Sequence, residues 1–532
     1  MTEENKDDRN GNGRRRLMAP FGTAWWAAVG GIAYLFLAYG FDWWGRGSGP
    51  NPWGVAAIRL VGAAICFGLI LGALELIKRA SVGTRILMLA WAAYLGAWAA
   101  VFWPGFVMGD TYGAFRSSQA FPINDWHGYF KPLAYGAALD LVPEFWFITL
   151  VQVGLAACVL GLWDLVLARH GAHWILRALP HLLLAINVAF VSNMLLLSRD
   201  TPFSLTVTAL AALAFHLVLK KEVPRRPLAL AVTLLSAMAV IWRTDGVLVA
   251  VPALLVLLWS IRAYPRAMVR YCAAAVALVA FVQIAVPLAA GRASDDWGYE
   301  LSVKLNPLGY ILQGDYFAEN KEEVLAAAGA VVDQQMLMSV QKPDEIASFW
   351  WGGVKWDASE ADKERFRRVY TRLLLDNLPL FLAGRIETTA GSSGLRSPIH
   401  AVYDHTSIWN ELDRATYNDP RPMEFDPPFP ELRAKLVDQL RQTAAYRGLT
   451  PSGSVLHWNY LPELLVLLAA LFLWRLAPAA AAAALVVTLR APAVMLLAPA
   501  SHFKYYLSLE ITGPFVLAAM LAELSRRFLA RS

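Results

Sequence analysis

Twelve apolar runs, most of them close to 20 residues long, constrain this chain more than any other feature of its sequence. They lie at 21–40, 54–77, 85–103, 144–167, 174–191, 202–219, 228–242, 246–262, 268–290, 457–474, 479–498 and 505–524. A run of about 20 apolar residues has the length of a helix that crosses the hydrocarbon core of a bilayer. Hydrophobic residues make up 57% of the 532 residues, more than a soluble domain usually contains. We therefore expect an all-α polytopic membrane protein with about 12 transmembrane helices.

Basic side chains gather in every second connection between these runs. The basic connections are Arg14–Arg16, Lys78–Arg85, Arg169–Arg177, Lys220–Arg226, Arg262–Arg270, Arg475 and Arg526–Arg527. With twelve spans they all lie on one side of the membrane, and the positive-inside rule makes that side cytoplasmic. Both termini are then cytoplasmic, and residues 1–20 form a cytoplasmic tail. The net charge of +6 is a topology signal, and no nucleic-acid-binding motif accompanies it.

Two long polar segments fall on the opposite, extracytoplasmic side. The first, 104–143, interrupts the nine spans of 21–290, and the second, 291–456, precedes the last three spans and short cytoplasmic tail of 457–532. The second segment carries 24 acidic and 18 basic side chains, and it is too long for a simple loop. We expect it to be mainly helical. Its predicted elements are helices at 322–338, 358–375 and 430–446 and a short re-entrant or interfacial helix at 373–382.

The 104–143 loop contains two short polar motifs, Gly109-Asp110-Thr111 and Asp125-Trp126-His127. A carboxylate at the lip of a membrane helix is costly unless it has a partner or a function. The structural alternative is that Asp110 caps a helix over 111–119. A second helix further along the loop is predicted to lie along the membrane surface. Its apolar face would consist of Trp126, Tyr129, Phe130, Leu133 and Ala137.

Three further polar clusters lie at span ends on the same side. They are Ser198-Arg199-Asp200-Thr201-Pro202, Arg243-Thr244-Asp245-Gly246 and His502-Phe503-Lys504-Tyr505-Tyr506. Each has an ordinary structural explanation: a helix cap, an Asp-Gly turn and an interfacial aromatic anchor. Four clusters on one face, from distant parts of the chain, are better explained by one site at the outer membrane boundary.

The residue types of these clusters favour chemistry on a phosphate-bearing substrate. Arginine, lysine and histidine hold phosphate groups, and a carboxylate can remove a proton from an attacking hydroxyl. The combination suits transfer from a donor whose leaving group is a lipid phosphate. A divalent cation, Mg²⁺ or Mn²⁺, shared by Asp110 and Asp200 is a further alternative. The three cysteines lie within apolar runs and have neither disulfide nor metal-ligand spacing.

The motifs together resemble the GT-C superfamily of membrane glycosyltransferases, which use polyprenyl-phosphate sugars at the extracytoplasmic face. The closer resemblance is to a bacterial branch whose first large loop carries an acidic motif and then a Trp-His-Pro-like motif. Those motifs read Gly109-Asp110-Thr111 and Asp125-Trp126-His127 in this chain, where Gly128 follows the histidine and Lys131-Pro132 comes later. The branch pattern continues with the clusters around Arg199, Arg243 and His502. The resemblance covers most of the chain in layout.

The resemblance implies a GT-C-like fold and a function for each cluster. Asp110 would be the general base of an inverting sugar transfer, with Asp200 as a second catalytic residue. The residues expected to bind the donor phosphate are Arg199, Arg243, His502, Lys504 and Tyr505. Those expected to position the sugar or the acceptor are Asp125, His127 and Asp245. The acceptor would be a cell-envelope glycan, a lipid or a protein, and the enzyme would lie among the lipids of the inner (plasma) membrane.

A multi-pass transporter or lipid flippase is the main alternative, and a scaffold that binds a partner through 291–456 is another. Transporters usually place their polar groups near the membrane midplane, within broken helices. In this chain the polar groups gather at one rim, and Glu75 and Arg490 are exceptions within spans. Because Arg490 lies in mid-span, we expect it to have a buried partner or a water-filled cavity.

Overall fold

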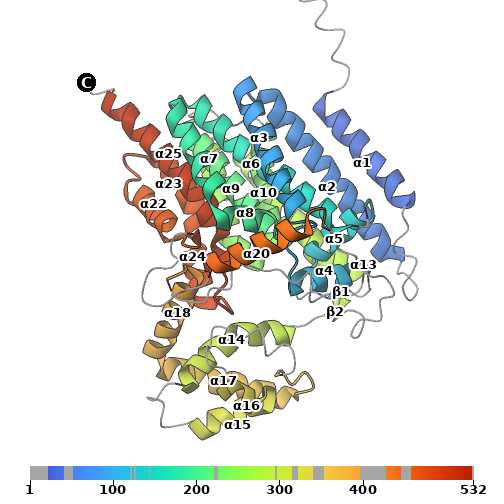
Figure 1. The fold of residues 1–532 in the computed structure, drawn as a ribbon, viewed down its shortest axis with the longest axis vertical. Coiled ribbons are helices and arrows are strands. Elements are labelled where there is room, and N and C mark those ends of the chain that lie inside the picture. The colour runs from blue at the N-terminus through green and yellow to red at the C-terminus, as the bar shows by residue number, and fades with distance from the viewer. Residues whose placement is uncertain are drawn as a thin grey trace, which may run out of the picture.

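The computed structural model describes residues 22–40, 52–119, 123–124, 128–142, 144–220, 224, 226–290, 292–293, 296–313, 321–339, 353–395, 427–444 and 457–529. Helices make up nearly all of the secondary structure of these residues (Figure 1). One short parallel pairing joins β1 (Ile123–Asn124) to β2 (Arg292–Ala293). The prediction of a helical polytopic protein is confirmed at this level.

Seven helices of the described residues are long and apolar enough to cross a membrane, or eight if the bent pair α7–α8 counts as one span. The seven are α2 (Pro52–Arg79), α3 (Val82–Val101), α6 (Phe145–Arg169), α9 (Asp200–Leu219), α12 (Pro265–Ala280) with its continuation through η3 (Phe281–Ala285) and α13 (Val286–Ala290), α23 (Pro478–Thr488) with α24 (Ala491–Leu497), and α25 (Leu507–Leu529). Proline stands in the first turn of α12, α23 and α24, where its missing N–H costs no intrahelical hydrogen bond.

Four shorter apolar helices coincide with four of the other predicted spans. They are α1 (Thr23–Gly40), α10 (Arg226–Trp242), α11 (Val247–Ser260) and α22 (Leu461–Phe472). Every predicted apolar run thus contains helix. By length and composition, however, the structure supports seven or eight spans, and the count of twelve stays a prediction.

The predicted span at 174–191 is broken. α7 (Trp174–Ile186) and α8 (Val188–Met194) meet at an angle of 76°. Asn187 stands between them in an extended conformation, and its side chain accepts a hydrogen bond from the backbone N–H of Phe190. An asparagine at this position satisfies an otherwise unpaired N–H at the start of α8. Asn187 therefore caps the start of α8 at the break.

Within the described residues, four of the basic connections are joined in pairs at one end of the helix bundle. Arg169 Nη2 at the end of α6 donates to the carbonyl of Arg79 at the end of α2, at 3.2 Å. Arg527 Nη1 near the end of α25 donates to the carbonyl of Arg475 beyond α22, at 2.8 Å. Figure 1 shows helices α14 to α17 beyond the other end of the bundle, away from the C-terminal end of α25. The bundle therefore has a basic end and an end that carries the extra helices.

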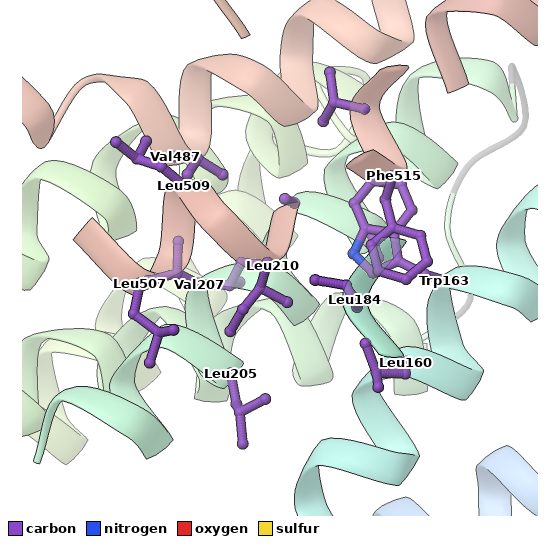
Figure 2. Packing of buried hydrophobic residues seen from close by; sticks show 14 of the residues in the cluster. Leu160, Trp163, Leu184, Leu205, Val207, Leu210, Val487, Leu507, Leu509 and Phe515 are labelled. Carbon is purple, nitrogen blue, oxygen red and sulfur yellow. The ribbon is translucent and has the colours of Figure 1, made fainter. Parts of the chain in front are cut away.

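The core of the bundle is built around α9, whose side chains are buried along most of its length. Figure 2 shows Leu205, Val207 and Leu210 of this helix between side chains of α6 and α25. Trp163 of α6 stacks on Phe515 of α25 with ring centroids 5.3 Å apart. This packing fixes the relative positions of the helices whose ends carry the polar clusters.

The 104–143 loop contains two helices, α4 (Gly109–Gln119) and α5 (Phe130–Leu139), as predicted. The apolar face of α5 is present, but it does not lie on a membrane surface. Tyr129, Phe130, Leu133 and Ala137 are buried against side chains of α1, α2, α10 and the η3–α13 segment. The fifth predicted member, Trp126, lies outside the described residues. The reason for the difference is tertiary packing, because helices distant in sequence cover this face.

Five helices of the 291–456 segment form a unit with its own core. They are α14 (Asp296–Gln313), α15 (Lys321–Val331), α16 (Gln334–Ser339), α17 (Glu360–Asp376) and α18 (Leu378–Ser392). Their buried side chains include Leu305, Val324 and Phe366. The single helix predicted at 322–338 is observed as two helices, α15 and α16, because the helical conformation is interrupted at Val332 and Asp333. The apolar stretch at 373–382 is likewise divided between the end of α17 and the start of α18.

Arg385 of α18 fastens this unit to the bundle. Its side chain is fully buried and donates to the carbonyls of Met495, at 3.0 Å, and Ala498, at 2.6 Å, at the end of α24. α20 (Pro430–Ala444) belongs with the bundle, since its buried Val437 and Ala444 lie in the bundle core. The described part of the 291–456 segment is therefore divided between these five helices, α14 to α18, and α20, which packs on the bundle. We call the five-helix unit the outer unit because it lies beyond one end of the bundle (Figure 1).

Candidate functional site

Two loops at the end of the bundle next to the outer unit pair with each other. The backbone N–H of Phe106 donates to the carbonyl of Leu195, and the N–H of Leu197 donates to the carbonyl of Phe106, both at 2.9 Å. The Thr111 hydroxyl donates to the carbonyl of Leu197 at 2.5 Å. Immediately after these contacts the chain enters α4 on one side and α9 on the other. The pairing thus brings together the first turns of two helices that are distant in sequence, since α4 begins at Gly109 and α9 (Asp200–Leu219) begins at Asp200.

Gly105 allows this approach. It has φ +115°, and a Cβ at this position would lie 2.6 Å from Thr149 Oγ1 and 2.9 Å from the carbonyl oxygen of Leu195. Any other L-residue would therefore be strained in backbone conformation and would collide with backbone. The Thr149 hydroxyl also donates to the carbonyl of Pro104 at 2.5 Å, which fixes the loop from the α6 side.

Lys504 joins the carboxylates at the starts of α4 and α9. It lies in η5 (Phe503–Tyr506), and its Nζ is 3.5 Å from Asp110 Oδ2 and 4.0 Å from Asp200 Oδ2. Its side chain is 2% exposed, whereas that of Asp110 is 40% exposed. A buried ammonium without carboxylates would be costly, so the two aspartates account for the position of this lysine.

A series of consecutive ion pairs links Asp200 to Arg490. Arg243 Nη1 donates to Asp200 Oδ1, and Arg243 Nε donates to Asp245 Oδ1 at 2.8 Å. Arg490 Nε donates to Asp245 Oδ2 at 2.7 Å, and its Nη1 donates to the carbonyl of Tyr505 at 2.6 Å. The predicted partner of Arg490 is thus the partly buried carboxylate of Asp245. Two guanidiniums and two carboxylates thus pair with one another where α9, α10 and the α23–α24 junction meet, while the buried Nη2 of Arg490 has no hydrogen-bond partner among the described residues.

Aromatic rings cover these cations. The guanidinium carbon of Arg490 lies 4.8 Å from the ring centroid of Phe203, and that of Arg243 lies 5.6 Å from the ring of Tyr505. The ring of His502 meets the Tyr505 ring edge-on, with centroids 5.3 Å apart. Cation–π contacts and burial strengthen the electrostatic interactions of the cluster.

The outer unit contributes Tyr299 from the first turn of α14. Its hydroxyl interacts by hydrogen bonds with the side chains of Arg199 and Thr244. Burial raises the pKa of Tyr299, but the positive charges of Arg199 and Arg243 outweigh burial and lower the pKa below its usual value. Arg199 thus reaches the cluster through a tyrosine that the sequence reading did not select.

Lys131 of α5 reaches Asp110 from the other side. Its Nζ donates to the backbone carbonyl of Asp110 at 2.7 Å, and its side chain is 1% exposed. Five cationic side chains of the described residues therefore surround three carboxylates. The cations are those of Lys131, Arg199, Arg243, Arg490 and Lys504, and the carboxylates are those of Asp110, Asp200 and Asp245. The site has an excess of positive charge beside one partly exposed carboxylate.

The geometry does not favour a divalent cation between Asp110 and Asp200. The ammonium of Lys504 faces both carboxylates and takes the position that a shared ion would need. The described residues also contain no group of three or more histidine, cysteine or acidic side chains arranged to hold a metal.

The structure brings together most of the residues that the sequence selected. Asp110, Asp200, Arg243, Asp245, Lys504 and Tyr505 form one connected cluster, Arg199 joins it through Tyr299, and His502 joins it through Tyr505. Asp125 and His127 lie outside the described residues, so their predicted role is unchanged. The sequence reading assigned no site role to Lys131, Tyr299 or Arg490. For Arg490 the signal was its mid-span position, and for Lys131 it was its place in the same loop as Asp110.

Searches against protein-family models, curated proteins and solved structures each find no match to this chain.

Proposed function

We propose that this protein is a membrane glycosyltransferase of GT-C type that moves a sugar from a polyprenyl-phosphate donor to an extracytoplasmic acceptor. The observation that carries the proposal is the partly exposed carboxylate of Asp110 beside a buried cluster with more cations than anions. The cations offer a place for a phosphate, and Asp110 offers a base next to it. The GT-C-like fold, the twelve spans and the outward orientation of the site belong to the proposal.

The chemistry assigns different tasks to the two first-turn aspartates. Asp110, which solvent can reach, would accept the proton of an acceptor hydroxyl as its oxygen attacks the anomeric carbon of the sugar. The bond between that carbon and the phosphate oxygen breaks, and the electron pair leaves with the polyprenyl phosphate. Attack opposite the leaving group inverts the anomeric centre. Asp200 is buried and occupied by Arg243, so it would order the cations rather than touch the substrate.

The leaving phosphate gains negative charge in this reaction, and fixed cations stabilise such charge most effectively where water is excluded. Lys504 Nζ lies 3.5 Å from the carboxylate oxygen Oδ2 of Asp110. Arg199 and Arg243 lie further along the same cluster and interact with Tyr299 and Tyr505. These three would hold the donor phosphate, with Tyr505 and His502 lining the approach.

The break between α7 and α8 favours one alternative, a transporter or lipid flippase. Asn187 at the break donates to the buried carboxylate of Glu510 in α25, and broken helices with buried polar groups are typical of transporters. The larger polar cluster nevertheless lies at the helix ends, where an enzyme that uses a membrane-bound donor needs it.

One assay separates the two functions. The purified full-length protein in lipid nanodiscs is supplied with polyprenyl-phosphate sugars and a bacterial envelope extract, and the release of polyprenyl phosphate is measured. We expect release with the wild type, and its loss in Asp110→Asn. The matched control is Asp376→Asn, which changes an exposed aspartate of the outer unit. A wild type that releases no polyprenyl phosphate but moves a solute or lipid across sealed vesicles would replace the enzyme by the transporter.

A further inference from the structure

Lys131 is a buried amine that faces the backbone of Asp110, while the carboxylate of the same aspartate faces solvent and Lys504. Its Nζ donates to the Asp110 carbonyl at 2.7 Å and lies 5.3 Å from the ring centroid of Tyr135 on its own helix. Only 1% of the residue is exposed. Its ammonium is engaged with the backbone carbonyl of Asp110, so we expect its effect on the reaction to pass through Asp110.

The contact fixes the first turn of α4. The carbonyl of a first-turn residue already accepts a hydrogen bond from within its helix, and Lys131 adds a second donor from α5. α4 is a short helix of 11 residues, and short helices in isolation are marginal. A bond of 2.7 Å from a neighbouring helix therefore restrains the part of α4 that carries Asp110.

We propose that Lys131 is a positioning residue for Asp110, which it holds through the backbone and whose basicity it sets through its charge. This inference rests on the proposed function of Asp110 as the general base. A protonated Lys131 stabilises the carboxylate anion and makes Asp110 a weaker base. A neutral Lys131 keeps the hydrogen bond, because an amine still donates, but it no longer opposes proton uptake by Asp110.

The surroundings of Lys131 place the loss of its proton near neutral pH. Burial lowers the pKa of Lys131 to about 7, and Asp110 on α4 opposes the shift. Arg199 before α9 and Lys504 in η5 lower the pKa further, whereas Asp200 on α9 raises it. Tyr135 is the nearest group on α5 itself. We therefore expect kcat of the wild type to rise as the pH increases through about 7, with little change in the KM for the donor.

Three variants separate the hydrogen bond from the charge. Lys131→Met removes both, and we expect kcat to fall by up to about 10²-fold through misplacement of Asp110, with the KM for the donor within about twofold of wild type. Lys131→Arg keeps a permanent charge and a donor, so kcat should show no rise near pH 7. Lys131→Gln keeps a donor without the charge, so its kcat should exceed that of Lys131→Met and should likewise show no rise near pH 7. Lys304→Met, at a lysine of α14 that pairs with Glu300, is the matched control.

Two results would overturn the inference. One is a rise in kcat near pH 7 that persists unchanged in Lys131→Arg. The other is a loss in Lys131→Met that appears in the KM for the donor rather than in kcat, because it would make Lys131 a binding residue. If Lys131→Met does not fold, the pH profiles of wild type and Lys131→Arg decide the matter. A different result would contradict the proposed function itself: an Asp110→Asn variant that still releases polyprenyl phosphate.

Discussion

Arg490 and Asp245 are 245 residues apart in the chain, yet Arg490 Nε lies 2.7 Å from Asp245 Oδ2. The arginine follows the end of α23 and the aspartate stands in η2 (Thr244–Gly246), the turn that precedes α11. A cation in a predicted span thus has its partner in a turn between two other helices. The pair ties the late helices to the middle of the bundle at the point where the candidate site lies.

Substitutions of Asp245 and of Arg490 should differ in their effect on the stability of the protein. Asp245→Asn leaves the buried Arg490 without its carboxylate, and a buried charge stripped of its partner costs about 3–5 kcal/mol. Arg490→Met should cost less, because Asp245 keeps its bonds to Arg243. Thermal unfolding in detergent measures both, with Asp376→Asn as the control. An equal or reversed order would mean that Arg243 alone does not satisfy Asp245 and that this carboxylate depends on Arg490.

Lys504→Met and Arg243→Met should weaken donor binding more than Asp110→Asn does. Both side chains would hold a phosphate that is present in the ground state and the transition state, so the KM for the donor rises. Some loss of kcat accompanies it, because the leaving phosphate gains charge. Asp110→Asn instead removes the base and should lower kcat by about 10²–10⁴-fold. Steady-state kinetics with a polyprenyl-phosphate sugar distinguish these patterns, and an unchanged KM in Lys504→Met would remove it from the phosphate site.

Glu510→Gln should stabilise the protein. The Glu510 carboxylate is 2% exposed, accepts a hydrogen bond from Asn187 and lies beside the Glu463 carboxyl, where no cation of the described residues pairs with it. A neutral amide of the same size removes a buried charge and still accepts from Asn187. The gain in melting temperature should be larger at alkaline than at acidic pH, because a carboxylate carries its charge only when deprotonated. A lower melting temperature at alkaline pH would show that the charge itself is needed.

The stability of the wild type should rise with pH between about 7 and the ordinary pKa of lysine, 10.5. The folded-state pKa of Lys131 lies below its unfolded value, so within this window the unfolded chain binds more protons and each increase in pH favours the folded state. Lys131→Met should flatten this part of the profile. Melting temperatures over the window measure the effect, and parallel profiles for the two proteins would contradict it.

The orientation of the bundle can be tested by labelling single cysteines with an impermeant reagent. The native cysteines Cys66, Cys158 and Cys272 are first replaced by alanine. A cysteine at exposed Glu364 of the outer unit should be labelled in intact cells, and one at exposed Ser81 between α2 and α3 only after the cytoplasmic side is opened. The opposite pattern would turn the site to the cytoplasm and exclude an extracytoplasmic reaction.

The sequence by itself determined that this chain forms a bundle of apolar helices, because the length and spacing of apolar runs decide where helices lie. It also selected Asp110, Asp200, Arg243, Asp245 and Lys504, since charged residues at span ends are costly without partners. Only the tertiary structure decided which partners they have. The pairing of Phe106 with the Leu195–Leu197 segment, the burial of Lys131 beneath Asp110 and the approach of Tyr299 join segments far apart in sequence. Those contacts depend on how helices pack, which no local pattern of residues specifies.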